Sequence, residues 1–295
     1  MTEEPITEDD AKWRAIQSKV QEARIVSVFR MFRQNGIEPV LLKGWAIARF
    51  YPEDLRRRVG DIDLAVSEAD YTSAVEILKT DEAIQLNIDL HRELRDLDTL
   101  PWEKIVEQTE LTEIDGEQIR TLGDEDHLRV LAVHWLLDGG RYKDKLWDIY
   151  YAVENRSDTF DWHRCLDVVD EHRRRWVVCA IGLAHHFLNL EIGNLPFADE
   201  AKNIPNWILR TLEREWRQSE DLQPILAVSY DPRWMMRQIF RRIPPNPIRA
   251  TIEAEGDLYD NSRFIYQIGV LKRRTRPFIK GVIGILRRKF SRSHS

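Results

Sequence analysis

The chain has 295 residues, of which 43% are hydrophobic and 32% are charged. This composition excludes an intrinsically disordered chain, which lacks the apolar surface that offsets the entropy lost on folding, and the length is typical of about two domains. The net charge of −6 argues against a general nucleic-acid binder, and a total of two cysteines, Cys165 and Cys179, argues against a disulfide scaffold or a thiolate zinc site.

Helix and strand patterns alternate through the first 122 residues. Apolar positions recur with a helical period over residues 8–34, where Thr7 is the candidate N-cap. Asp115-Gly116 separates two short strand patterns and predicts a β-hairpin. The expected elements in between are a strand over 39–42, a helix over 45–50, a strand over 61–66, a helix over 69–79 and a strand over 85–91, followed by hairpin strands over 110–114 and 118–122.

Beyond residue 122 every pattern is helical. Helices are expected over 124–137, 145–154, 162–171, 175–190 and 204–217. The predicted fold class is therefore α/β followed by all-α, in which a small, mixed, twisted sheet precedes a C-terminal helical bundle. We expect an α/β domain with an N-terminal helix over 1–122, a helical domain over 123–270 and a basic amphipathic tail over 271–295.

Charge is unevenly distributed along the chain. Residues 272–295 contain nine Lys or Arg and no Asp or Glu, so the first 271 residues carry a net charge of −15. This acidic body makes a long nucleic acid an unexpected partner, because phosphate contacts need clustered basic residues. The tail has the pattern of a basic amphipathic helix, which can dock on the acidic body, lie on an anionic membrane surface, contact a protein partner or contact RNA.

The sequence predicts neither a signal peptide nor a membrane span. Residues 1–10 are acidic, whereas a signal peptide begins with positive charge. The longest mostly apolar stretch, 176–190, contains two histidines and is shorter than the roughly 20 residues that cross a bilayer. We expect a cytoplasmic protein whose tail allows peripheral contact with a membrane.

Acidic residues alternate with apolar residues in two of the predicted strands. Side chains at positions i and i+2 of a strand point to the same face, so Asp61 and Asp63 project together, and Asp89 alternates with its neighbours in the same way. An adjacent strand would place Asp89 beside the first pair. Neighbouring carboxylates repel one another unless a cation neutralises them, and their oxygen atoms favour Mg²⁺. The pattern predicts a site for one or two Mg²⁺ ions that serves phosphoryl or nucleotidyl transfer.

Basic residues accompany this acidic trio. Lys43-Gly44 follows a predicted strand and begins a helix, a combination that binds phosphate through charge and backbone N–H groups. Arg56-Arg57-Arg58 precedes the acidic strand and either meets a triphosphate or forms a solvated loop. His91 falls on the same strand face as Asp89 and is a candidate ligand for a nucleotide phosphate.

The order of these motifs resembles the uncharacterised nucleotidyltransferase family of the polymerase-beta-like nucleotidyltransferase superfamily. The matching segments are Val40-Leu41-Leu42-Lys43-Gly44, Arg58-Val59-Gly60-Asp61-Ile62-Asp63-Leu64 and Ile88-Asp89-Leu90-His91. The resemblance implies a nucleotidyltransferase-type sheet, with Asp61, Asp63 and Asp89 as catalytic metal ligands. It also implies that Lys43 and Gly44 form the turn that contacts the triphosphate of an NTP. Arg58, in the basic stretch before the acidic strand, is a further candidate to hold the triphosphate. The chain departs from the superfamily at Trp45, where a second small residue is usual, so Trp45 is expected to crowd the phosphate turn.

Three polar residues share one face of the predicted helix over 124–137 and the turn after it. His127, His134 and Asp138 lie at helical spacing, and this face either forms a second metal site, contacts a substrate or the other domain, or is structural. Asp148 is expected to pair with an Arg or a His or to cap a local network.

We therefore expect a Mg²⁺-dependent nucleotidyltransferase that moves a nucleoside monophosphate from an NTP, with ATP as the expected donor, to a hydroxyl acceptor and releases pyrophosphate. The acceptor is a small molecule, a peptide or a protein, and Asp89 could also help to deprotonate it. The alternative is a catalytically inactive binding module with the same fold that acts through partner or membrane contacts. A weaker alternative is a metal-dependent phosphohydrolase that uses the face formed by His127 and His134.

Overall fold

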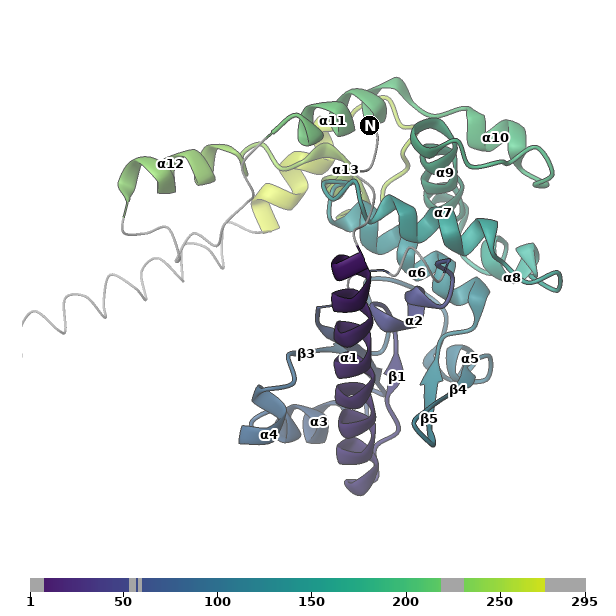
Figure 1. Cartoon of the computed structure of the whole chain (residues 1–295). Helices are drawn as coiled ribbons and strands as arrows, with labels where there is room; N and C mark the ends of the chain where they lie inside the picture. Colours follow the sequence, from purple (N-terminus) through teal and green to yellow (C-terminus); the bar gives the residue numbers. More distant parts are fainter. Residues whose placement is uncertain (1–7, 53–56, 58–59, 219–230, 274–295) are drawn as a thin grey trace, which may run out of the picture.

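A computed structural model describes residues 8–52, 57, 60–218 and 231–273 (Figure 1). Several predicted features lie outside these described residues: the N-cap at Thr7, the phosphate contacts of Arg56 and Arg58, and most of the basic amphipathic tail.

The strands of the described chain form one mixed five-stranded sheet in the order β3-β2-β1-β5-β4, which confirms the predicted mixed sheet. The strands are β1 (Val40–Leu41), β2 (Ile62–Val66), β3 (Ile88–Arg92), β4 (Glu110–Ile114) and β5 (Glu117–Thr121). Strand β2 is parallel to β3 and antiparallel to β1, and β1 is parallel to β5. The predicted hairpin joins β4 to β5, and its turn residues Asp115 and Gly116 both have positive φ, as a type I′ turn requires.

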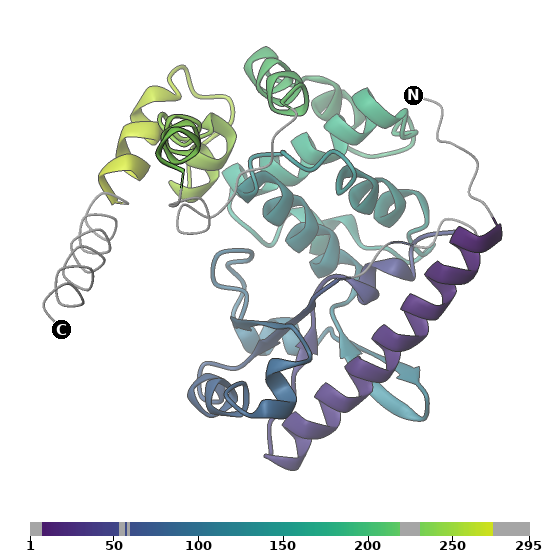
Figure 2. The ribbon, with the colours of Figure 1, turned by 60° about the vertical axis from the view of Figure 1, so that its left-hand side comes forward.

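The long helix α1 (Glu8–Gln34) covers one face of the sheet (Figures 1 and 2) and has the bounds that its periodicity predicts. Its buried residues and the alternate aliphatic residues of β2 belong to one apolar cluster, which includes Ile25, Phe29, Phe32, Ile62, Leu64 and Val66. Because side chains alternate along a strand, packing these aliphatic residues against α1 turns Asp63 and Ala65 toward the opposite face.

Helices follow in the second half of the chain, and residues of the first two of them line a cavity together with Asp63 and Asp89 of the sheet. These helices are α6 (Asp124–Leu137), α7 (Leu146–Glu154), α8 (Trp162–Leu166), α9 (Glu171–Leu188), α10 (Ala198–Lys202), α11 (Asn206–Trp216), α12 (Pro232–Phe240) and α13 (Pro247–Glu253). Helix α6 is buried along most of its length, and its Trp135 belongs to the same apolar cluster as Val40 and Leu42 around β1. One core therefore continues from the sheet into these helices.

Short helices connect the strands in the first part of the chain. They are α2 (Trp45–Ala48), α3 (Tyr71–Ile77), α4 (Asp81–Ile84) and α5 (Trp102–Val106). Strand β3 begins three residues later than predicted because α4 and the turn after it occupy the preceding segment. Within the part of the chain that the structure describes, no strand follows β5, and no helix is long and apolar enough to cross a membrane.

Some predicted helix boundaries are wrong. The helix predicted over 162–171 ends at Leu166, because Asp170 has an extended backbone and starts the separate helix α9. Helices α12 and α13 were not predicted, although each begins with a capping side chain followed by proline, the pattern of a helix start. The prolines at 244, 245 and 247 suggest from the sequence that the helical region is interrupted there. In the structure, Asn246 and Pro247 instead begin α13.

Candidate functional site

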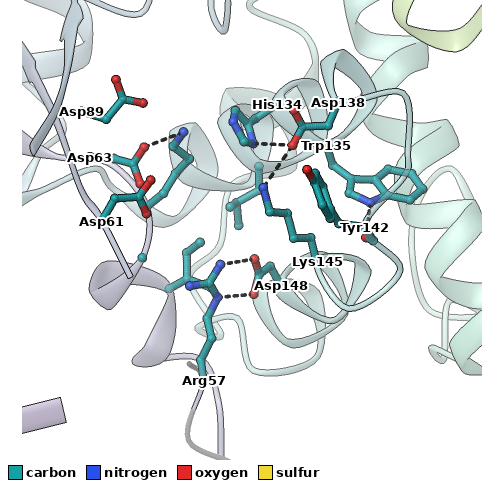
Figure 3. A pocket seen from close by; sticks show the side chains of 14 residues that line it. Arg57, Asp61, Asp63, Asp89, His134, Trp135, Asp138, Tyr142, Lys145 and Asp148 are labelled. Atoms are coloured by element: carbon teal, nitrogen blue, oxygen red, sulfur yellow. Dashed lines mark hydrogen bonds and ion pairs between the residues drawn. The ribbon is translucent and has the colours of Figure 1, made fainter. Parts of the chain in front are cut away.

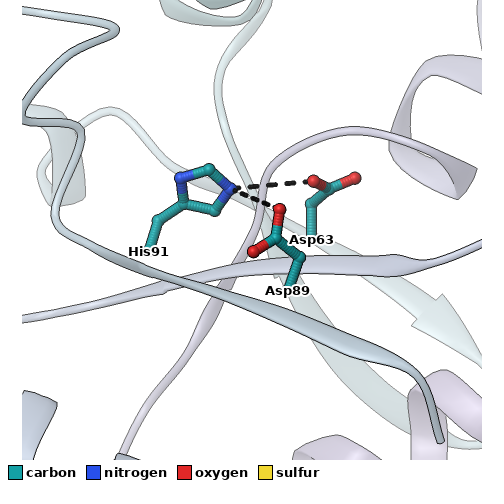
Figure 4. Close-up of side chains that lie close together, drawn as sticks. All are labelled: Asp63, Asp89 and His91. Atoms are coloured by element: carbon teal, nitrogen blue, oxygen red, sulfur yellow. Dashed lines mark ion pairs between the residues drawn. The ribbon is translucent and has the colours of Figure 1, made fainter. Parts of the chain in front are cut away.

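Strands β2 and β3 bring Asp63, Asp89 and His91 together on the face of the sheet turned away from α1 (Figure 4). The parallel register pairs Asp63 directly with Asp89, and His91 lies two residues further along β3 on the same face. One donor atom from each of the three side chains lies within 4.8 Å of the others. The adjacency predicted for Asp63 and Asp89 is therefore present in the fold.

The charges of this group are strongly coupled. Burial opposes ionisation of Asp63, but His91 and Lys43 more than offset it and hold the pKa of Asp63 at about 2. Burial also disfavours the charged form of His91, yet Asp63 and Asp89 raise the pKa of its imidazole to about 8. The neighbouring His91 imidazole lowers the pKa of Asp89. The carboxylates of Asp63 and Asp89 are therefore ionised at neutral pH. Together they stabilise a positive charge placed between them.

Lys43 supplies part of that positive charge. Its Nζ lies 2.8 Å from Asp63 Oδ1, and both side chains are less than 10% exposed. Lys43 follows β1 directly, and the pairing of β1 with β2 continues through the hydrogen bond from Leu42 N to Asp63 O. Gly44 comes next with φ 63° and ψ −111°, a conformation that favours glycine, and begins α2.

A cavity of about 250 Å³ opens between the sheet and the helices (Figure 3). On the sheet side it is lined by Lys43, Gly44, Asp61, Asp63 and Asp89. On the helical side it is lined by Leu131, His134, Trp135, Asp138, Tyr142, Lys145 and Asp148, together with Ile47 and Arg57. All three predicted metal ligands and the Lys43-Gly44 turn thus face one cavity, while Arg58 lies outside the described residues.

Two networks hold the helical wall of the cavity. The Oδ2 atom of Asp138 lies 3.1 Å from Lys145 Nζ and 3.9 Å from His134 Nδ1. Asp148 accepts two hydrogen bonds from Arg57, at 2.6 and 2.9 Å, and a third from the Tyr51 hydroxyl at 2.7 Å. The predicted Arg partner of Asp148 is therefore Arg57, which is mostly buried rather than part of a solvated loop.

Sequence reasoning missed three lining residues, Trp135, Tyr142 and Lys145. They come together because the chain reverses after α6 through two consecutive residues with positive φ, Gly139 and Gly140, and Trp135 Nε1 donates to Tyr142 O at 3.0 Å. The glycine pair was a visible sign of this reversal, since positive φ favours glycine.

The predicted polar face of α6 is divided in the structure. His134 and Asp138 line the cavity, whereas His127 is fully buried with its ring edge-on to Phe50. Burial lowers the pKa of His127 well below its usual value. The three residues do not form a metal-ligand group, and among the described residues such a group is found at Asp63, Asp89 and His91.

His134 makes the stability of the protein sensitive to acid. Burial, and then the charge of Lys43, lower its pKa to about 4 from a usual value of 6.5. The unfolded chain therefore binds this proton more readily, and stability falls as pH decreases from about 6.5 to 4. We expect His134→Asn to remove about 2 kcal/mol of the change in stability between pH 7 and pH 5. Urea unfolding of the wild type and of His134→Asn at pH 7 and pH 5 measures this difference in stability. An equal loss of stability in the two proteins between these pH values would show that His134 is not the titrating group.

A family model described as an uncharacterised nucleotidyltransferase matches residues 8–85 and 82–189, which together make up more than half of the chain. No curated protein and no solved structure matches the chain. The matched residues include Asp61, the two strands that carry Asp63 and Asp89, and the Lys43-Gly44 turn. They also include the helices α6 and α7 that form the opposite wall of the cavity.

Proposed function

This chain belongs to the uncharacterised nucleotidyltransferase family, and from that premise we propose that it moves a nucleoside monophosphate from an NTP, with ATP as the expected donor, to a hydroxyl group and releases pyrophosphate. The observation that carries the proposal is the convergence of Asp61, Asp63 and Asp89 with the Lys43-Gly44 turn at one cavity. Carboxylates beside a phosphate-binding turn are the parts that nucleotidyl transfer requires.

The donor set fits a divalent cation. Asp63 and Asp89 are held in the ionised form and face each other across two strands, and Asp61 lies in the same cavity. We propose that these three carboxylates hold one or two Mg²⁺ ions. When bound, the cation neutralises phosphate charge and lowers the barrier to in-line attack on the α-phosphorus.

The residues of the turn have a separate task, which is to bind the triphosphate. Lys43 and Gly44 both line the cavity, and a cation beside the backbone N–H groups of a helix start attracts phosphate oxygens. Trp45 packs against α1 instead, with its Nε1 3.3 Å from Glu22 Oε1. This position supports an open phosphate turn. Arg58 stays a predicted triphosphate contact.

Asp89 is placed to act on the acceptor. Its side chain is 58% exposed, whereas that of Asp63 is 7% exposed, so an incoming hydroxyl group can reach Asp89 and give it a proton. The cavity, at about 250 Å³, is smaller than the roughly 300–1,000 Å³ of pockets that enclose whole ligands. We propose that the acceptor, a small molecule, peptide or protein, inserts only its hydroxyl-bearing end.

The remaining features complete the proposal. We propose that the helices after residue 122 form a helical domain over 123–270 that closes the cavity from the side opposite the sheet. The protein acts in the cytoplasm, and its basic tail contacts a partner or a membrane surface.

Labelled nucleotides test the transfer directly. Incubation of a lysate with the protein and ATP labelled at the α or the γ phosphate is expected to place label on an acceptor from the α position alone. The double variant Asp61→Asn/Asp63→Asn is expected to abolish the label and the metal-dependent binding of ATP. Equal ATP binding by both proteins without label transfer would instead favour the inactive binding module.

A further inference from the structure

His91 carries a buried nitrogen atom without a hydrogen-bond partner. Its Nε2 is inaccessible to solvent and makes no hydrogen bond to any described residue. This atom points at the two carboxylates, 3.4 Å from Asp89 Oδ2 and 3.7 Å from Asp63 Oδ1 (Figure 4). Both distances exceed the roughly 2.7–3.2 Å of a normal N–H···O hydrogen bond, so this nitrogen is close enough to the two carboxylates to share one bound ion with them.

The distances from His91 Nε2 to the two carboxylates match those between ligands of one ion. Two ligands that each lie about 2.1 Å from one small divalent ion are roughly 3 to 4.2 Å from each other. Both distances from His91 Nε2 fall in this range. The backbone register supports the same arrangement, because Asp63 and Asp89 are direct partners and His91 is the next residue of β3 on that face.

We infer that the divalent cation displaces the proton of His91 Nε2 to solvent and takes that nitrogen as a ligand, and that with this imidazole the site binds Mn²⁺ more tightly than Mg²⁺. The inference rests on the proposed function in taking these carboxylates as the metal site, and it changes the expected role of His91 from phosphate contact to metal ligand. Imidazole nitrogen is a ligand that transition-metal ions accept, whereas Mg²⁺ favours a shell made of oxygen atoms alone. Carboxylates suit Mn²⁺ as well, so a set of two carboxylates and one imidazole favours Mn²⁺ over Mg²⁺.

The consequence is a measurable difference in affinity. We expect the Kd of the full-length protein for Mn²⁺ to be at least about tenfold below its Kd for Mg²⁺. In His91→Asp, which makes the donor set all oxygen, the preference is expected to shrink by about tenfold. The matched control is His163→Gln on α8, whose side chain is 75% exposed and pairs with Asp167, and this variant is expected to keep the wild-type preference.

Pulsed electron paramagnetic resonance of the Mn²⁺-loaded protein tests the ligand itself, without nucleotide. We expect hyperfine coupling to a histidine nitrogen that changes with ¹⁵N-histidine labelling, disappears in His91→Gln and persists in His163→Gln. Bound Mn²⁺ without nitrogen coupling in the wild type, or no Mn²⁺ binding at all, would overturn the inference whether or not any variant folds.

The two proposals fail separately. Transfer of α-label without nitrogen coupling would remove His91 as a ligand and leave the proposed function standing. Nitrogen coupling with no transfer of α-label would leave the metal ligand standing and remove the proposed function.

Discussion

Asp63→Asn is expected to lower the rate of nucleotidyl transfer by about 10³-fold or more. Asp63 is the most enclosed carboxylate of the trio, and it contacts both Lys43 and His91. Asparagine has nearly the same shape but carries no charge, so the substitution removes attraction for the cation while preserving the packing of β2. Transfer of label from α-labelled ATP, measured at saturating Mg²⁺ or Mn²⁺, gives the size of the loss.

The same substitution also affects stability. Without the Asp63 charge, the Lys43 ammonium stays buried beside a neutral amide, and breaking a buried ion pair from one side costs on the order of 3–5 kcal/mol. Transfer must therefore be measured at a temperature where circular dichroism shows the variant to be folded. Glu113→Gln on β4 serves as the control, because Glu113 is an exposed acidic residue of the same sheet. Wild-type transfer by folded Asp63→Asn would contradict the assignment of Asp63.

Arg129→Met is expected to destabilise the protein by about 3–5 kcal/mol. Arg129 lies on α6 with 2% of its surface exposed, and its Nε donates to Asp98 Oδ2 at 2.8 Å. Its other nitrogens donate to Asp126 and to the backbone oxygen of Arg164 on α8. Removing the guanidinium leaves the Asp98 carboxylate buried without its ion-pair partner, and the connection between the segment after β3 and helices α6 and α8 is lost.

A surface ion pair provides the comparison for Arg129. Lys79 and Glu76 lie three residues apart around the C-terminus of α3, with side chains more than 60% exposed, and Lys79→Met is expected to cost less than about 1 kcal/mol. Urea unfolding followed by circular dichroism measures both variants against the wild type. Equal midpoints for Arg129→Met and Lys79→Met would show that the buried network does not hold these segments together.

Repeating patterns along the chain were enough to predict which side chains share a face. The 3.6-residue period gave the bounds of α1, and the two-residue period of β2 separated Asp63 from the aliphatic residues that pack on α1. Turn chemistry located the hairpin at Asp115-Gly116. These features are local, because backbone geometry alone decides the direction of each side chain once the element type is known.

Helix boundaries in the second half were harder to predict. Helix α6 has the bounds predicted over 124–137, whereas short helices such as α10 depend on packing against their neighbours for stability, and no period in the sequence marks them. The capping residues of α12 and α13 were present in the sequence, but the prolines beside them also fit a break in the chain.

The sequence by itself determined that Asp63 and Asp89 point away from the aliphatic residues of their strands, whereas Asp61, predicted on the same strand as Asp63, lies just before β2. The tertiary structure decided which contacts these residues make: it placed β3 beside β2 in the register that sets Asp89 opposite Asp63, and it directed His91 at both. It also joined Arg57 to Asp148, 91 positions away in the chain. The physical reason is that strand pairing and buried ion pairs form between distant segments as the core packs, and no local period in the sequence encodes which segments will meet.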